Sequence, residues 1–236
     1  MYFYRSWRRS IAGYSALFLV ILTTRRPSYC SALASSSFSN SCSSFGGQTK
    51  TGHMNFNWGV VESVDAASAS IGVDCCSAIS KLYMKDDGTY PNNDRYPLIF
   101  LHDCWHDSDQ TARQQLIKQG WTSPWAWGIF SYHHYHSTAW ELLLCIKGHA
   151  SVQMGGPTGP TVQVQKGDLL YIPPGLAHKQ LAAGGGFLLL GAYPDPSVDV
   201  DILRGTPTDE QRRNIRNCPP PKLDPLLGID LSKLYR

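Results

Sequence analysis

Short hydrophobic stretches separated by glycine and proline fill the chain between residues 98 and 192. In Thr161–Gln165, apolar and polar residues alternate strictly, so one face of this stretch would point to a core and the other to water. Closely spaced stretches of this kind predict an all-β sandwich or barrel. The expected strands are Leu98–Leu101, Ile129–His136, Glu141–Ile146, Ala150–Met154, Thr161–Gln165, Asp168–Ile172, His178–Leu181 and Phe187–Ala192.

Helical patterns are few in this chain of 236 residues, which has room for one domain with appendages. The best helix runs from Asp109 to Lys118, where Ser108 or Asp109 can cap it. Residues 55–84 are rich in Ala and Ser with weak periodicity, which favours one or two short helices or a loosely attached arm. We therefore predict one barrel over residues 85–200, followed by a C-terminal arm over residues 201–236 that lies on the barrel or on a partner subunit.

The N-terminal residues have the composition of targeting segments. A basic start precedes the apolar run Ile11–Leu22, and Ala32-Leu33-Ala34 offers a small-residue cleavage site, so residues 1–34 are expected to be a signal-type segment. Residues 35–54 are rich in serine and lack acids, as in transit peptides. Localisation to the secretory pathway or to a plastid follows, with a plain secretory signal or an uncleaved anchor as alternatives. The apolar run is shorter than the roughly 20 residues of a membrane span, so we expect a soluble mature domain with no stable span.

Charge and cysteine content exclude two classes of function. Residues 1–52 carry six basic side chains and no acid, whereas the rest of the chain holds three more acidic than basic residues. Because phosphate contacts need clustered Lys and Arg, a nucleic-acid partner is not expected. Seven cysteines without CxxC spacing argue against a zinc-cysteine cluster and a disulfide framework, and most are expected to be small buried hydrophobic residues.

The strongest candidate chemistry lies between Gly128 and His178. His134 and His136 are two residues apart, so in a strand both imidazoles would project from the same face. Glu141 begins the next expected strand, where a hairpin would set its carboxylate beside them, and His178 can supply a third imidazole. Three imidazoles and one carboxylate suit one divalent transition metal (Fe, Mn, Ni, Zn or Cu) and disfavour Ca or Mg.

These residues fall into two spaced motifs that resemble the paired motifs of the cupin superfamily. The resemblance implies a single cupin (double-stranded β-helix, or jelly-roll) barrel with a metal held by the same four residues. The one departure is Ala182, where an Asn that is not a metal ligand is usual. The motifs are Gly128, five residues, His134-Tyr135-His136, four residues, Glu141, six residues, Gly148, and then Gly167, five residues, Pro173-Pro174-Gly175, two residues, His178.

Four shorter segments resemble, more narrowly, the YjlB-type cupins of bacteria, a branch without an assigned function. This resemblance covers roughly residues 85 to 228 and implies no substrate. It is carried by Asp86-Asp87-Gly88, Pro91-Asn92-Asn93, Tyr132-His133-His134-Tyr135-His136 and Gly191-Ala192-Tyr193-Pro194.

Three functions are compatible with the motifs, and all take a small-molecule substrate or ligand. The commonest cupin chemistry is that of a mononuclear dioxygenase-like enzyme on a small organic oxygen compound, although fold alone does not decide function. A sugar or keto-acid isomerase or epimerase is the second, with Lys147 or Lys179 as anion-binding candidates. A non-enzymic binding or storage protein is the third. No catalytic side chain is assigned, and the resemblance implies a homodimer.

Aromatic residues crowd the approach to the motifs. Trp121, Trp125, Trp127 and Trp140 could line an apolar pocket or belong to the core, and Trp140 is best placed for the pocket because it adjoins Glu141. If the strand is regular, His133 points away from His134 and has a structural or surface role.

Overall fold

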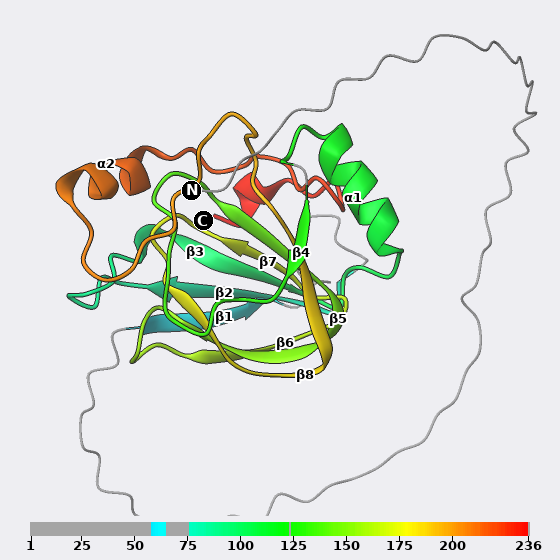
Figure 1. Cartoon of the computed structure of the whole chain (residues 1–236), viewed down its shortest axis with the longest axis horizontal. Coiled ribbons are helices and arrows are strands. Elements are labelled where there is room, and N and C mark those ends of the chain that lie inside the picture. The colour runs from blue at the N-terminus through cyan, green and yellow to red at the C-terminus, as the bar shows by residue number, and fades with distance from the viewer. Residues whose placement is uncertain (1–57, 65–75, 123, 236) are drawn as a thin grey trace, which may run out of the picture. The chain divides into compact units, whose positions relative to one another are not determined.

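Antiparallel strands predominate in the computed structural model, which describes residues 58–64, 76–122 and 124–235 (Figure 1). No helix in this part of the chain is long and apolar enough to cross a membrane. The targeting segments expected at residues 1–34 and 35–54 lie outside the described residues. The elements are β1 (Trp58–Val64), β2 (Ala78–Met84), β3 (Asn93–His102), α1 (Asp109–Lys118), β4 (Trp125–Trp127), β5 (Glu141–Met154), β6 (Thr161–Gln165), β7 (Leu169–Ile172), β8 (His178–Ala192), α2 (Asp209–Asn217) and the 3-10 turn Leu231–Lys233.

The strands are joined in the order β1-β2-β3-β7-β5-β8-β4, and β6 pairs with β5. Strand β5 pairs with β7 along residues 141–144 and with β6 along residues 149–153, while β8 accompanies it along both parts. Register shifts interrupt the β5–β8 pair between Cys145 and Lys147, between Lys147 and His149, and between Ser151 and Val152. Shifts of this kind bend paired strands, so the sheet closes into the expected jelly-roll barrel.

Glycines that we expected to separate strands instead lie inside two long ones. The stretches predicted at residues 141–146 and 150–154 are one strand, as are those at 178–181 and 187–192. Gly148 has a φ of +69°, and a Cβ there would lie 2.4 Å from the carbonyl oxygen of Gly184. These glycines therefore allow two backbones to approach closely at a bend, which in sequence has the same signature as a turn.

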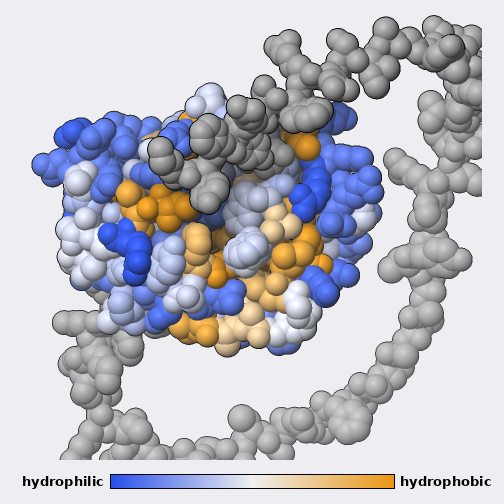
Figure 2. Space-filling view, viewed as in Figure 1, coloured by the Kyte–Doolittle hydropathy of each residue, from blue (hydrophilic) through white to orange (hydrophobic). Residues whose placement is uncertain are grey.

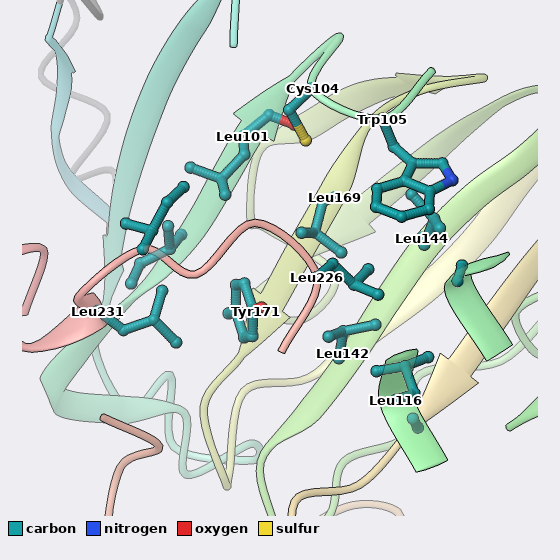
Figure 3. Packing of buried hydrophobic residues seen from close by; sticks show 14 of the residues in the cluster. Leu101, Cys104, Trp105, Leu116, Leu142, Leu144, Leu169, Tyr171, Leu226 and Leu231 are labelled. Atoms are coloured by element: carbon teal, nitrogen blue, oxygen red, sulfur yellow. The ribbon is translucent and has the colours of Figure 1, made fainter. Parts of the chain in front are cut away.

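The central strands are buried on both faces, which explains their continuous apolar runs. One side packs into an inner cluster between the strands, which includes Leu98, Leu143, Leu170 and Leu189. The other side packs into an outer cluster, which includes Leu101, Leu142, Leu169 and Leu190 (Figure 3). Successive residues thus alternate between the two clusters, whereas edge strand β6 buries Val164 and exposes Thr161, Gln163 and Gln165, as its sequence predicts.

The outer cluster is closed by α1 and by the C-terminal arm. Helix α1 has the predicted bounds, and the Ser108 side chain caps it by accepting from Thr111 N at 3.1 Å. The arm adds four buried side chains to the same cluster, so it packs on its own barrel (Figure 3). These are Leu226, Ile229, Leu231 and Leu234.

The C-terminal arm also contains α2, which we did not predict. A capping box at its start, in which Thr208 and Gln211 bond each other's backbone, was the available sequence signal.

Two expectations about secondary structure are wrong. Between residues 55 and 84 the described chain forms strands β1 and β2 rather than short helices, and β2 pairs with β3 before residue 85, where we expected the barrel to begin. Edge pairing across the sheet overrides weak local periodicity. Residues 129–136 form no regular strand; single bridges join His134 to His178 and Tyr135 to Leu203 instead.

The described cysteines are mostly buried, as expected: Cys76, Cys104 and Cys145 are buried, and Cys218 is partly buried.

Hydrophobic side chains also reach the surface on the face shown in Figure 2. Among the described residues, the exposed large hydrophobic side chains belong to Ile117, Trp127, Phe130, Leu181, Ile202 and Leu223.

We predict that Asp224, a buried residue of the C-terminal arm, makes stability fall as pH rises. Its carboxylate is buried and accepts from Leu226 N and Leu227 N at 2.6 and 2.7 Å, but burial outweighs these bonds and raises the pKa of the carboxyl. The folded state then binds more protons than the unfolded state above the unfolded pKa of about 4. In Asp224→Asn, which keeps the accepting oxygen, this loss is absent.

Thermal unfolding of both proteins between pH 4 and 7 checks this expectation. The melting temperature of Asp224→Asn minus that of the wild type should increase with pH. A difference that is constant or that shrinks with pH would show that the folded protein does not favour the neutral carboxyl.

Candidate metal centre

Two of the four candidate ligands are the first residues of long strands. Glu141 begins β5 and has the parity of Leu143, so its side chain faces the inner side of the barrel rather than the outer cluster. His178 begins β8, and its backbone pairs with that of Met154 at the far end of β5. Because the β5–β8 pair bends, Glu141 at one end of the pair and His178 at the other can contribute to the same site.

The other two ligands come from the segment that joins β4 to β5. His134 N donates to His178 O at 3.2 Å, and His178 N donates to His134 O at 3.0 Å. Tyr135 and Leu203 exchange a second pair of backbone bonds, at 3.0 and 2.9 Å. These two pairs hold His134 and His136 against the barrel without a regular strand.

The structure brings all four side chains together in the interior. One ring nitrogen from each of His134, His136 and His178 lies within 4.8 Å of the other two. Glu141 Oε2 lies 3.2 Å from His178 Nε2 and 3.6 Å from His136 Nε2. All four residues are at most 5% exposed. Burying such a group of ring nitrogens and carboxylate oxygens destabilises the folded state unless a cation or a proton compensates them.

Hydrogen bonds to the backbone decide which imidazole nitrogen is available. His134 Nδ1 faces Tyr132 O at 3.4 Å, His178 Nδ1 faces Leu176 O at 3.1 Å, and His136 Nδ1 faces Asp201 O. A carbonyl oxygen can only accept, so each neutral ring carries its hydrogen on Nδ1 and leaves Nε2 with a free lone pair. Nitrogen lone pairs fixed in this way are characteristic of metal-binding histidines.

The charges of the centre favour one positive charge beside Glu141. Burial opposes ionisation of this carboxyl, but the neighbouring His136 and His178 prevail and lower its pKa. Burial also opposes a proton on His136, yet the Glu141 carboxylate raises the pKa of that ring. Burial and the neighbouring His178 lower the pKa of His134 to about 3. A proton on His136 and a metal ion would therefore compete for the same place.

The C-terminal segment supports His136 from outside, a contribution that the sequence did not reveal. Asp201 accepts from Ser137 N at 2.6 Å and from the Ser137 hydroxyl, while its own backbone carbonyl receives His136 Nδ1. Val200 and Ile202, on either side, line the cavity described below. Asp201 therefore contacts the histidine loop, while its two neighbours contribute to the lining of the cavity.

Tyr193 is a second residue of the centre that we did not single out as functional. Its hydroxyl lies 3.5 Å from Glu141 Oε1, and its ring is 5.5 Å from that of His136. Burial, and then the Glu141 carboxylate, raise the pKa of this phenol, so it stays protonated and able to donate. The signal available in the sequence was its place in the segment Gly191-Ala192-Tyr193-Pro194.

A cavity of about 570 Å³ opens onto the four ligands. Trp125 and Trp127 line it, as does Phe130, whose ring meets that of His134 edge-on at 4.9 Å. Trp121 and Trp140 belong instead to the outer cluster. The preference for Trp140 as a pocket residue is therefore wrong, because neighbours along a strand face opposite sides and Glu141 occupies the inner one.

His133 and the two lysines lie outside the centre. His133 is buried, and its Nε2 lies 3.2 Å from Gln153 Oε1, in agreement with the structural role expected from alternation. Lys147 is exposed and Lys179 is partly exposed, and neither lines the cavity.

Comparison with known proteins gives a family and a relative. Residues 117–186 match the family model described as a cupin domain. Over 148 residues the chain is 33% identical to the uncharacterised protein YjlB of Bacillus subtilis (strain 168), and the match covers 62% of this chain and 88% of YjlB.

Solved structures resemble the chain only distantly. They include procruciferin, the 11S globulin of Brassica napus (16% identity, TM-score 0.28, 59% of this chain and 30% of that one), and a Lactobacillus farciminis oxalate decarboxylase (15%, 0.26, 61% and 30%). A DUF861 family protein of Thermotoga maritima is matched over 36% of this chain and 92% of its own (19%, 0.25). The chain spans less than a third of the globulin and of the decarboxylase. At these identities and TM-scores, the similarities say nothing about chemistry.

We predict that Asp201 supports metal affinity although it is not a ligand. Asp201→Ala removes both bonds to Ser137 and loosens the segment whose carbonyl orients His136, so affinity for zinc should fall about tenfold. Competition with a chromophoric chelator measures this change. Asp199→Ala, two residues away with an exposed side chain, is the matched control and should leave affinity unchanged. Equal affinities for both variants would contradict the supporting role.

Proposed function

The chain belongs to the cupin family, in its YjlB-type branch, and from this membership we propose that it is a mononuclear metalloenzyme acting on a small organic oxygen compound. His134, His136, Glu141 and His178 would hold one divalent transition metal (Fe, Mn, Ni, Zn or Cu). The observation that carries the proposal is that three buried imidazoles keep their hydrogens on Nδ1 and share the site with a buried carboxylate. When bound, such an ion supplies Lewis acidity and, for iron, a place for dioxygen.

The protein's own side chains would orient the substrate and exclude water. The Tyr193 hydroxyl can donate a hydrogen bond toward the same space that Glu141 faces. Trp125 and Phe130 line the cavity with aromatic rings, and an apolar lining strengthens the electrostatic interactions at its polar end.

A dioxygenase-like reaction fits this cavity better than sugar or keto-acid isomerisation. Isomerases of that kind need a cation for the substrate's phosphate or carboxylate, and the two lysines considered for this role do not line the cavity. A protein that binds its ligand without converting it is the remaining alternative, and the experiment below separates it from the enzymes.

Metal analysis of the protein, purified without added metal or affinity chelation, tests the proposal. We expect close to one transition-metal ion per chain in the wild type and almost none in a His134→Ala/His136→Ala double variant, which loses two of the four ligands. A His106→Ala/His149→Ala double variant removes two exposed histidines outside the centre and is the matched control. Circular dichroism of all three proteins shows whether the barrel is retained.

The identity of the metal directs the next measurement. Iron lost with the double variant would support the dioxygenase-like reaction and call for an oxygen-uptake screen, whereas zinc, manganese or nickel would favour isomerase chemistry. Absence of metal from the folded wild type, even after reconstitution, would refute the metalloenzyme and leave a cupin that only binds.

A further inference from the structure

The polar groups of the cavity are gathered in one place. Its polar lining consists of the four candidate ligands and Tyr193, while the other side chains that line it are apolar. Among the described residues, no Lys, Arg, Asp, Asn, Gln, Ser or Thr lines the cavity. A ligand could therefore find hydrogen-bond and metal partners at one end only, and its remaining surface would meet hydrocarbon and aromatic rings.

The mouth of this cavity exposes hydrophobic side chains to water. Trp127 is 69% exposed, Ile202 is 53% exposed and Phe130 is 37% exposed, and all three line the cavity. These residues come from β4, from the segment after it and from the C-terminal arm, so distant parts of the chain contribute to the same apolar rim. Contiguous apolar surface around a concave site indicates a ligand that covers it.

The Arg204 guanidinium, which is linked to the rim through Tyr132, is already engaged. The Arg204 guanidinium lies 4.3 Å from the centre of the Tyr132 ring, and the Tyr132 ring stacks on Phe130 at 4.9 Å. Arg204 does not line the cavity. A phosphate or carboxylate carried by the body of a ligand would thus lose its hydration without gaining a charged partner, which is unfavourable.

We infer that the site takes a small molecule with an uncharged, apolar body and a single oxygen-bearing head group. The head group meets the centre formed by His134, His136, Glu141 and His178, and the body lies against Trp125, Trp127, Phe130 and Ile202. The inference about the head group rests on the proposed function. The inference about the body rests on the lining of the cavity alone. The same lining disfavours ligands whose body carries a phosphate or a second carboxylate.

Three hydroxamates with the same head group test the inference on the metal-loaded protein. Hexanohydroxamate should bind at least about tenfold more tightly than acetohydroxamate, since burial of two of its four additional methylenes would suffice. Adipic monohydroxamate, which has the same chain length and ends in a carboxylate, should lose this gain. Isothermal titration calorimetry measures the three affinities. Equal affinities, or tightest binding of the carboxylate, would overturn the inference.

Matched isoleucine variants locate the apolar contact. Ile202→Ala, at the rim, should reduce the advantage of hexanohydroxamate over acetohydroxamate severalfold. Ile117→Ala should not, because Ile117 is 57% exposed on helix α1 and does not line the cavity. Both side chains are exposed, so neither change should threaten folding. Equal effects of the two variants would contradict an apolar site at the rim.

A neutral fluorescent probe separates this inference from the proposed function. N-phenyl-1-naphthylamine should bind the metal-free protein and be displaced by hexanol but not by hexanoate. If the protein cannot be loaded with metal but still binds the probe, the metalloenzyme is refuted and the apolar site is supported. A metal-loaded protein that neither binds the probe nor distinguishes the hydroxamates would refute the apolar site alone. If Trp127→Ala abolished a dimer while probe binding was unchanged, the rim would be a contact between copies and the inference would fail.

Discussion

Three imidazoles and a carboxylate buried within a few ångströms of one another impose the constraint to which the rest of this structure responds. Glu141 Oε2 and His136 Nε2 are buried and face each other at 3.6 Å without a well-formed hydrogen bond. Unpaired polar atoms of this kind destabilise a fold unless a cation or a shared proton compensates them. Three backbone carbonyl groups accept from Nδ1 of these rings and hold them in one tautomer. This arrangement leaves the three Nε2 atoms available as metal ligands.

The architecture meets this constraint by separating stability from the site. The central strands bury one side in the outer cluster, where α1 and the C-terminal arm complete a continuous hydrophobic core. Their other side is therefore available for a cavity and for polar groups at one end of the inner cluster. The bends in β5 and β8 permit this arrangement. They allow this pair of strands to contribute Glu141 and His178 to the site while β5 also pairs with β6.

Two parts of the C-terminal arm have different roles. Residues 224–234 add side chains to the outer cluster, on the side of the sheet away from the cavity. Residues 201–203 instead extend the site, where Asp201 orients the histidine loop and Ile202 adds to the apolar rim. A segment that looked like an appendage in the sequence is therefore part of both the core and the candidate centre.

The sequence by itself determined the all-β class, helix α1 and the four side chains that gather in the centre. These features depend on local periodicity and on short spacings: His134 and His136 are two residues apart, and Glu141 shares the parity of Leu143. Only the tertiary structure decided that Tyr193 and Asp201 join the centre, that Trp125 rather than Trp140 lines the cavity, and that the region before residue 85 pairs as strands. Each of these depends on contacts between segments far apart in the chain, such as that between Ser137 and Asp201, which are 64 positions apart. Local patterns of polarity carry no information about which distant segment will lie alongside, because that choice is made by packing of the whole barrel.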